Sequence, residues 1–454
     1  MTLDTLVVDT PSGPVRAEHT DGLLHARGLR YARARRFEPC VPVPTWTETV
    51  DATRRGPACP QLPSRIESVT GPMLTGLDLD EDCLRVSVTA PTPDGRVRPV
   101  LVWLHGGAYV SGGGESEKYD PEALARENDV VVVTVTYRLG ILGYLGIDSV
   151  APANLGLLDQ IAALRWVRDA VGSFGGDPDV VTVFGHSAGA DSIAALLVAD
   201  GAQGLFHRAV LQSAPLALRG DATAMSAAMG TAARAALGDD PSGLSIDDVL
   251  AAHTAALAAA TDFGFASGMA FGPQYGEHPL PPFGEIVARR AASATSVEVL
   301  IGWTSDDGSP FVEAIPRLQR LAHLPVVGSA LRRLLTAIVT RRAFSAPATA
   351  FADAHRAAGG RAVTYEFSWG ADDSGVGACH SIEIPFLLGT PQAWSDAPML
   401  GAHAASALAE LGPRLRRRWA DFARDGVTFA ETDHLTLGQT AGRHATNPSD
   451  VETQ

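Results

Sequence analysis

One junction between a strand and a helix constrains this chain more than any other feature. The apolar run at residues 180–184 predicts a buried strand, which leads straight into residues 185–189 (GHSAG), and a helix is expected at 193–198. So sharp a turn holds Ser187 in a strained backbone conformation, and the flanking glycines let strand and helix approach closely. The pattern therefore predicts an exposed serine hydroxyl at a helix N-terminus, where negative charge is favoured.

The rest of the chain alternates buried strands with amphipathic helices. Residues 100–104 and 130–136 are continuous apolar runs, which are typical of strands buried on both faces of a parallel sheet. Residues 154–171 carry apolar side chains at helical spacing. We therefore expect an α/β fold with a mostly parallel central sheet and helices on both faces. Further strands are expected at residues 209–212, 297–301 and 363–367, and a last helix at 411–424.

We expect these elements to form one large domain spanning residues 1–454, although length alone would allow two or three. Residues 4–17 predict an antiparallel hairpin, and the alternating residues 84–89 predict an edge strand. Two alanine-rich helical insertions and a loose polar tail complete the chain, at about residues 216–295, 311–358 and 438–454.

Composition and charge narrow the classes of partner. The chain carries 36 basic and 51 acidic side chains, and the net charge of -15 argues against nonspecific binding to nucleic acid or anionic lipid. No apolar run approaches the ~18 residues of a membrane helix. Because the N-terminus lacks a basic segment followed by an apolar one, a cytoplasmic protein is expected, with secretion as the alternative if the sequence is that of a processed form. The expected partner is a small molecule, and the oligomeric state does not follow from the sequence.

A second glycine-rich segment precedes the serine and suits the stabilisation of negative charge. Residues 105–108 (HGGA) directly follow the strand expected at 100–104. Attack of a hydroxyl on a carbonyl carbon builds an oxyanion, which preorganised backbone N–H groups stabilise. Glycines let that backbone approach the substrate. We therefore predict an oxyanion hole formed by the N–H groups of Gly106, Gly107 and Ala188.

A serine nucleophile of this kind also needs an acid and a histidine, in the chain order serine, acid, histidine. Asp306 and Asp307 follow the strand expected at 297–301, as the acid should. His380 lies in a glycine-rich loop after the strand expected at 363–367. The chain has 13 histidines, so the residue pattern alone leaves both partners open.

These motifs resemble those of the type B carboxylesterase family, which also includes the cholinesterases, and the resemblance runs from about residue 7 to residue 426. The resemblance implies an α/β-hydrolase fold with Ser187 as nucleophile and His380 as general base. It implies Asp307, which stands immediately before a glycine, as the acid, and it implies the same oxyanion positions. Its most specific parts are residues 154–167, 174–178 and 183–189.

Three features of the sequence bear on this resemblance. Asp307 stands where the family usually has glutamate, which shortens the acid by one methylene and keeps Asp306 as an alternative. His186 replaces the glutamate that many members carry beside the serine, so the local charge becomes neutral or positive and His186 becomes a candidate pocket residue. Cys59 and Cys83 match the family's first disulfide pair by position, so the resemblance makes a bond between them a candidate; in a reducing cytoplasm the alternative is a pair of free thiols.

The predicted function is hydrolysis of carboxylic esters through a Ser-His-Asp triad and an acyl-enzyme, on short- to medium-chain or aryl esters. A transacylase, or a hydrolase of lactones, carbamates or amides, would use the same triad and is an alternative. A non-catalytic binding module is disfavoured because all three triad positions are filled. The sequence has neither a metal motif such as His-Glu-x-x-His nor a phosphate loop, so no metal and no cofactor are expected.

Overall fold

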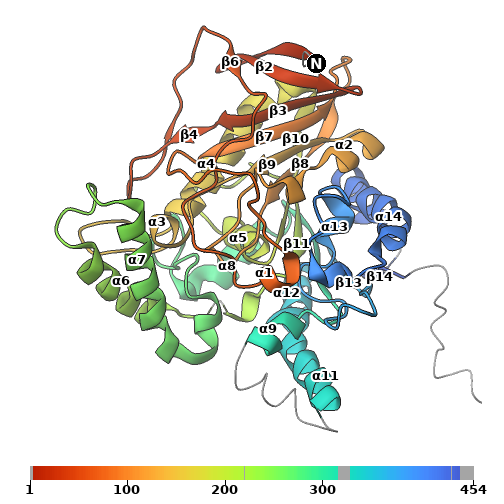
Figure 1. The fold of residues 1–454 in the computed structure, drawn as a ribbon. Helices are drawn as coiled ribbons and strands as arrows, with labels where there is room; N and C mark the ends of the chain where they lie inside the picture. The colour runs from red at the N-terminus through yellow and green to blue at the C-terminus, as the bar shows by residue number, and fades with distance from the viewer. Residues whose placement is uncertain (1–3, 219, 315–327, 431, 440–454) are drawn as a thin grey trace, which may run out of the picture.

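The computed structural model describes the whole chain except residues 1–3, 219, 315–327, 431 and 440–454. A 12-stranded sheet runs through the molecule in the order β1-β2-β3-β7-β9-β8-β10-β11-β12-β13-β14, with β6 paired to β2 (Figure 1). The strands of this sheet are β1 (Thr5–Thr10), β2 (Gly13–Thr20), β3 (Leu23–Arg30), β6 (Val50–Asp51), β7 (Arg85–Pro91), β8 (Arg98–Leu104), β9 (Val131–Val135), β10 (Gly176–His186), β11 (Arg208–Gln212), β12 (Glu298–Thr304), β13 (Ala362–Phe367) and β14 (His434–Leu437).

The helices that surround this sheet lie between the strands in the chain. They are α1 (Glu67–Thr70), α2 (Glu122–Asn128), α3 (Gly140–Gly143), α4 (Leu155–Ala170), α5 (Ala188–Leu196), α6 (Thr223–Leu237), α7 (Ile246–Ala260), α8 (Ile286–Ser293), α9 (Ser309–Ala314), α11 (Gly328–Val339), α12 (Ala346–Ala357), α13 (Ile384–Leu387) and α14 (Ala404–Asp425). A π-helical turn, η6 (Thr340–Ser345), joins α11 to α12.

The pairing of the main strands changes once along the sheet, from antiparallel to parallel. Every neighbouring pair from β9 to β14 is parallel, whereas the four pairs that link β1, β2, β3, β7 and β9 are antiparallel. The N-terminal hairpin pairs Thr10 with Gly13 at its turn. The expected mostly parallel α/β sheet with an N-terminal antiparallel hairpin is therefore confirmed.

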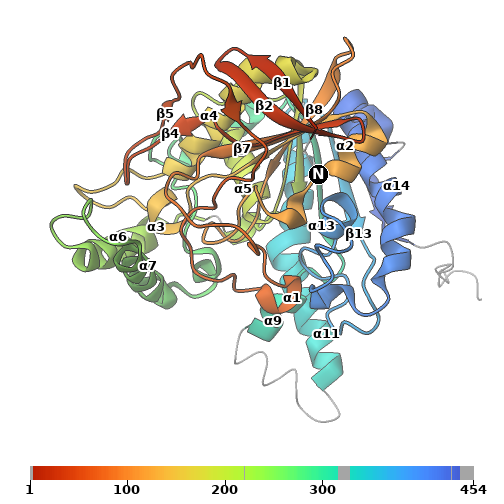
Figure 2. The same cartoon turned by 45° about the horizontal axis from the view of Figure 1, so that its top comes forward.

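Side chains of the central strands alternate between two cores. Val100, Val102 and Leu104 of β8 face one core, which also contains buried side chains of α4 and α5. Leu101 and Trp103 face the other core, which contains buried side chains of α2 and α14. Figure 2 shows α4 and α14 on different sides of the sheet. Continuous apolar runs are required here because both faces of each strand are covered.

Three elements differ from the sequence-based expectation. β7 is not an edge strand, because it lies between β3 and β9 and the N-terminal strands extend the sheet beyond it. β14 adds an unexpected parallel strand beside β13. α14 begins seven residues before the expected start at 411 and continues through Pro413. The places of β7 and β14 in the sheet depend on pairing with strands that are distant in the sequence. The spacing of apolar residues carries no information about such pairing.

The expected helical insertions contain α6, α7 and α8 in the first, and α11 and α12 in the second. Residues 315–327 of the second insertion and 440–454 of the expected tail lie outside the described residues. The stretch Ile246–Met269 is long and apolar enough to cross a membrane by length and composition alone. It therefore differs from the expectation that no stretch reaches this length. Its backbone breaks at Gly264, and Val249, Ala252 and Ala256 of α7 are buried in the core.

Candidate active site

Ser187 sits at the turn from β10 into α5, as expected from the sequence. Its backbone adopts φ 55° and ψ -120°, a conformation that non-glycine residues rarely hold. A Cβ atom on Gly189 would lie 2.0 Å from Leu104 O, and one on Gly185 would lie 2.8 Å from the same oxygen. Only glycine fits at both places. The strained serine is therefore held by tight packing of the helix start against β8.

The loop after β8 brings residues 105–108 against the serine. A Cβ atom on Gly106 would come within 3.2 Å of Ser187 Cβ, so this loop and Ser187 are neighbours. Gly107 has φ 114°, a conformation that favours glycine. Within the described chain, the backbone N–H groups of Gly106 and Gly107 have no hydrogen bond acceptor. Ala188 is the first residue of α5, so its N–H has no partner inside the helix.

His380 and Asp307 form a buried pair. The distance from His380 Nδ1 to Asp307 Oδ1 is 2.6 Å, and the two side chains are 2% and 0% exposed. The second carboxylate oxygen of Asp307 accepts hydrogen bonds from Ser213 Oγ at 2.8 Å and from the Thr304 backbone N–H at 3.0 Å. These two donors fix the carboxylate so that its other oxygen faces the imidazole.

Asp306 points elsewhere, although it is the neighbour of Asp307. Its Oδ2 accepts the backbone N–H of Ala378 at 3.0 Å, and its own N–H donates to Ala378 O at 2.9 Å. Asp306 thus ties the end of β12 to the loop that carries His380. Asp307 therefore contacts His380 itself, whereas Asp306 contacts the loop that carries His380.

The side chain of His186 packs against His380 in the folded chain. It precedes Ser187, and its ring centroid lies 4.4 Å from that of His380. In the residues that the structure describes, no hydrogen bond joins Ser187 Oγ to His380 Nε2. Such bonds are often long in enzymes without substrate and shorten on binding. His380 therefore contacts Asp307 on one side and the residue before Ser187 on another.

Two phenylalanines pack on His380 and were not anticipated from the sequence. The Phe311 ring of α9 meets the His380 ring edge-on at 5.1 Å, and the Phe344 ring of η6 lies at 5.2 Å. Phe344 is buried, whereas Phe311 is half-buried. Both come from the expected second insertion, whose side chains could not be placed from sequence. They add an apolar wall beside the imidazole.

Comparison with known proteins supports the relationship that the motifs suggest. A sequence model described as "Carboxylesterase family" matches residues 4–324. The chain belongs to the carboxylesterase family. A protein of Rhodococcus erythropolis named "Probable N-octanoylanthranilate hydrolase" is 40% identical over 425 residues, which are 92% of this chain and 93% of that protein. The para-nitrobenzyl esterase of Bacillus subtilis (strain 168) is 34% identical over 94% of this chain and 91% of its own.

A solved structure, described as a thermophilic PNB esterase, has the same fold as this carboxylesterase. Its TM-score is 0.73 at 30% identity, over 96% of this chain and 92% of that chain. The expected α/β-hydrolase fold is therefore confirmed, and the chain is a serine carboxylesterase by family.

Burial keeps several ionisable groups around the site of this carboxylesterase uncharged. Burial lowers the pKa of His105, in the oxyanion loop, to about 4. Burial also raises the pKa of Glu383, three residues after His380, to about 8, although hydrogen bonds from Gln212 and Tyr365 oppose the shift. His105 and Glu383 therefore add little charge to the interior around the triad at neutral pH.

The cysteine pair implied by the family resemblance is not bonded in this structure. Cys59 and Cys83 are both free thiols with 0% exposure. A hydrogen bond with Cys59, together with burial, raises the pKa of Cys83 well above its ordinary value. The structure therefore has a buried pair of thiols in place of the disulfide that the resemblance suggests.

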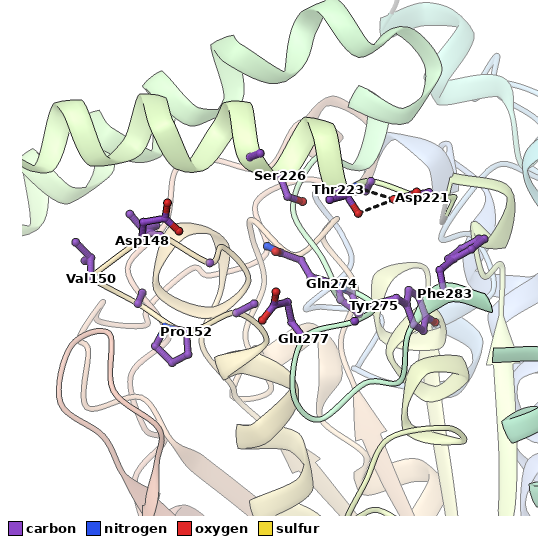
Figure 3. Close-up of a pocket in the computed structure, with 18 of the residues that line it drawn as sticks. Asp148, Val150, Pro152, Asp221, Thr223, Ser226, Gln274, Tyr275, Glu277 and Phe283 are labelled. Atoms are coloured by element: carbon purple, nitrogen blue, oxygen red, sulfur yellow. Dashed lines mark hydrogen bonds between the residues drawn. The ribbon is translucent and has the colours of Figure 1, made fainter. Parts of the chain in front are cut away.

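One cavity in the described chain lies apart from the triad. Its volume is about 750 Å³. Figure 3 shows side chains from the loop after α3, from the start of α6 and from the 273–277 loop around it. Neither Ser187 nor His380 lines it. In all the parts of the chain that the structure describes, no cluster of three or more histidine, cysteine or acidic side chains could hold a metal ion.

Proposed function

We propose that this carboxylesterase hydrolyses carboxylic esters through an acyl-enzyme on Ser187. The observation that carries the proposal is the buried 2.6 Å contact between His380 Nδ1 and Asp307 Oδ1. The His380 ring also packs on His186, the residue before the strained Ser187. Asp307 fixes the tautomer in which His380 Nε2 is free to accept a proton, and it stabilises the imidazolium that forms.

The chemistry proceeds in two halves. In the first, Ser187 Oγ bonds to the acyl carbon as its proton passes to His380, and the N–H groups of Gly106, Gly107 and Ala188 hold the oxyanion. The C–O bond to the alcohol then breaks while His380 returns the proton to the leaving oxygen. In the second half, water attacks the acyl-enzyme in the same way and releases the acid.

We propose short- to medium-chain and aryl esters as the substrates. The apolar rings of Phe311 and Phe344 beside His380 support this, because aryl and alkyl groups gain from contact with such a wall. A second candidate function is hydrolysis of the amide bond of N-acylanthranilates. The name of the Rhodococcus relative, which is 40% identical over nearly the whole chain, favours it.

The test is hydrolysis of p-nitrophenyl esters from acetate to palmitate, together with N-octanoylanthranilate, by the wild type and by Ser187→Ala. We expect kcat/KM for the esters to fall at least ~10³-fold in the variant, because removal of the nucleophile leaves only binding and the oxyanion hole. Ester hydrolysis by the wild type that is no faster than that of the variant would overturn the proposal. Release of anthranilate by the wild type alone would establish the second candidate.

A further inference from the structure

The loop that follows β8 holds three successive residues in a backbone conformation that favours glycine. Gly107, Ala108 and Tyr109 have φ values of 114°, 54° and 62°. Alanine and tyrosine are strained in this conformation, and such strain persists only where the surrounding structure fixes the chain. The contacts that anchor this loop therefore decide where the N–H groups of Gly106 and Gly107 lie.

The first half of the loop is anchored through two carbonyl groups. Tyr137 Oη donates to His105 O at 2.6 Å, and His105 Nδ1 donates to Gly106 O at 2.8 Å. In a trans peptide, the N–H group points away from the carbonyl oxygen of the residue before it. The N–H groups of Gly106 and Gly107 therefore point away from Tyr137 and from the His105 ring, and neither has an acceptor in the part of the chain that the structure describes.

The second half of the loop is anchored to the helix that starts beside Ser187. Tyr109 Oη donates to Asp191 Oδ2 at 2.7 Å, and the two residues are 1% and 3% exposed. The Tyr109 ring packs on the Tyr144 ring, with 4.4 Å between the centroids. Asp191 lies in the first turn of α5, and its N–H donates to Ser187 O at 2.9 Å. The bond from Tyr109 therefore ties the loop to the helix whose first residue is Ala188.

We propose that Tyr109 and Asp191 are positioning residues of the oxyanion hole. Their hydrogen bond fixes the loop N–H groups relative to the N–H group of Ala188, so that all of them meet at one oxygen. Without this bond, the strain at Ala108 and Tyr109 relaxes and the loop N–H groups move away from the oxyanion. The inference rests on the proposed function, because it requires an oxyanion to form on the acyl group bound to Ser187.

The test compares catalysis with the binding of an oxyanion. The probe is octyl trifluoromethyl ketone. Ser187 Oγ adds to its carbonyl carbon, the serine proton passes to His380, and the resulting oxyanion lies in the oxyanion hole. No group leaves, so the Ki of the ketone depends on the same N–H donors as kcat/KM for p-nitrophenyl octanoate. Unlike kcat, Ki does not depend on the fraction of the enzyme that is folded.

Tyr109→Phe removes one oxygen atom and keeps the ring on Tyr144. We expect kcat to fall about 10- to 100-fold and KM to stay within ~3-fold of the wild type, because the oxyanion forms only after the ester has bound. Ki for the ketone should rise by the same factor as kcat/KM falls.

The variants of Asp191 separate loss of the acceptor from change of the residue. Asp191→Ala removes the acceptor and should cause the same losses as Tyr109→Phe. Asp191→Asn keeps an acceptor oxygen, so kcat and Ki should stay within ~5-fold of the wild type. The double variant Tyr109→Phe/Asp191→Ala should lose no more than either single variant, because both substitutions break the same hydrogen bond.

Tyr31→Phe is the matched control. The Tyr31 side chain is as buried as that of Tyr109, and its hydroxyl donates to Thr136 O at 2.9 Å, outside the loop. This variant should lose about as much stability in urea unfolding as Tyr109→Phe, while its kcat and Ki stay within ~2-fold of the wild type.

Wild-type values of kcat and Ki in Tyr109→Phe would overturn the inference, and this variant decides alone if Asp191→Ala does not fold. A fall in kcat without a rise in Ki would also overturn it, because the loss would then arise outside the oxyanion hole. The wild type separates these results from a failure of the proposed function. If it neither hydrolyses p-nitrophenyl octanoate nor binds the ketone, the esterase proposal itself fails.

Discussion

His380 Nδ1 lies 2.6 Å from Asp307 Oδ1, and solvent barely reaches either side chain. The residues are 73 positions apart in the chain, and each stands in a loop after its own strand. Ser213, at the end of the strand between those of Ser187 and Asp307, holds the other carboxylate oxygen. Three neighbouring strands of the sheet thus place the proposed nucleophile, the acid and the residue that orients the acid.

Asparagine at position 307 should slow the reaction far more than asparagine at position 306. Asp307→Asn removes the charge that stabilises the His380 imidazolium, and we expect kcat for a p-nitrophenyl ester to fall ~10²- to 10⁴-fold. Asp306→Asn keeps an oxygen that can accept the Ala378 N–H, so its kcat should stay within ~10-fold of the wild type. Equal losses in both variants would contradict the assignment of the acid.

Glu383 should make the stability of the protein depend on pH. Its pKa is raised from 4.5 to about 8 by burial. Between these values the folded protein holds a proton at Glu383 that the unfolded chain has released. Its free energy of unfolding must therefore fall as the pH rises through this window, with no further loss from this group above about pH 8.

Glu383→Gln should remove this pH dependence while it keeps an oxygen to accept from Tyr365. We expect the variant to gain on the order of a few kcal/mol relative to the wild type between pH 5 and pH 8. Urea unfolding at both pH values measures this difference. Parallel stability curves for the two proteins would show that Glu383 ionises normally.

The buried ion pair of Arg138 and Asp159 should be essential for stability. Arg138 Nη2 lies 2.7 Å from Asp159 Oδ1, and the side chains are 4% and 0% exposed. Asp159→Asn leaves the guanidinium buried without its counter-charge, and we expect it to cost about 3–5 kcal/mol in urea unfolding.

Asp169→Asn is the matched control for this variant, because Asp169 lies on the same helix, α4, in an exposed pair with Arg168. Its cost should stay below about 0.5 kcal/mol. A similar small cost for Asp159→Asn would mean that water or another group compensates the arginine.

The thiol content reports directly on the cysteine pair. All four cysteines are free in the structure, so protein denatured without reductant should give four thiols with a chromogenic disulfide reagent. The native protein should react slowly even at half-buried Cys40, because burial raises the pKa of its thiol to about 12. A count of two thiols after denaturation would instead establish the Cys59–Cys83 bond.

The sequence by itself determined the central strands, the turn at Ser187 and the glycine loop before it. Each of these depends on local chemistry. A strand covered on both faces must be apolar throughout, and a strand that turns sharply into a helix needs glycine at residues 185 and 189. Such requirements are written in a few consecutive residues, so they can be recognised without knowing the rest of the fold.

Only the tertiary structure decided which residue within or beside a local motif contacts His380. Asp306 and Asp307 are adjacent in sequence, yet one carboxylate faces Ala378 and the other faces His380. The contact of His186 with His380 likewise joins residues almost two hundred positions apart. Such contacts arise from the packing of distant strands and loops, and the composition of either segment alone does not encode them.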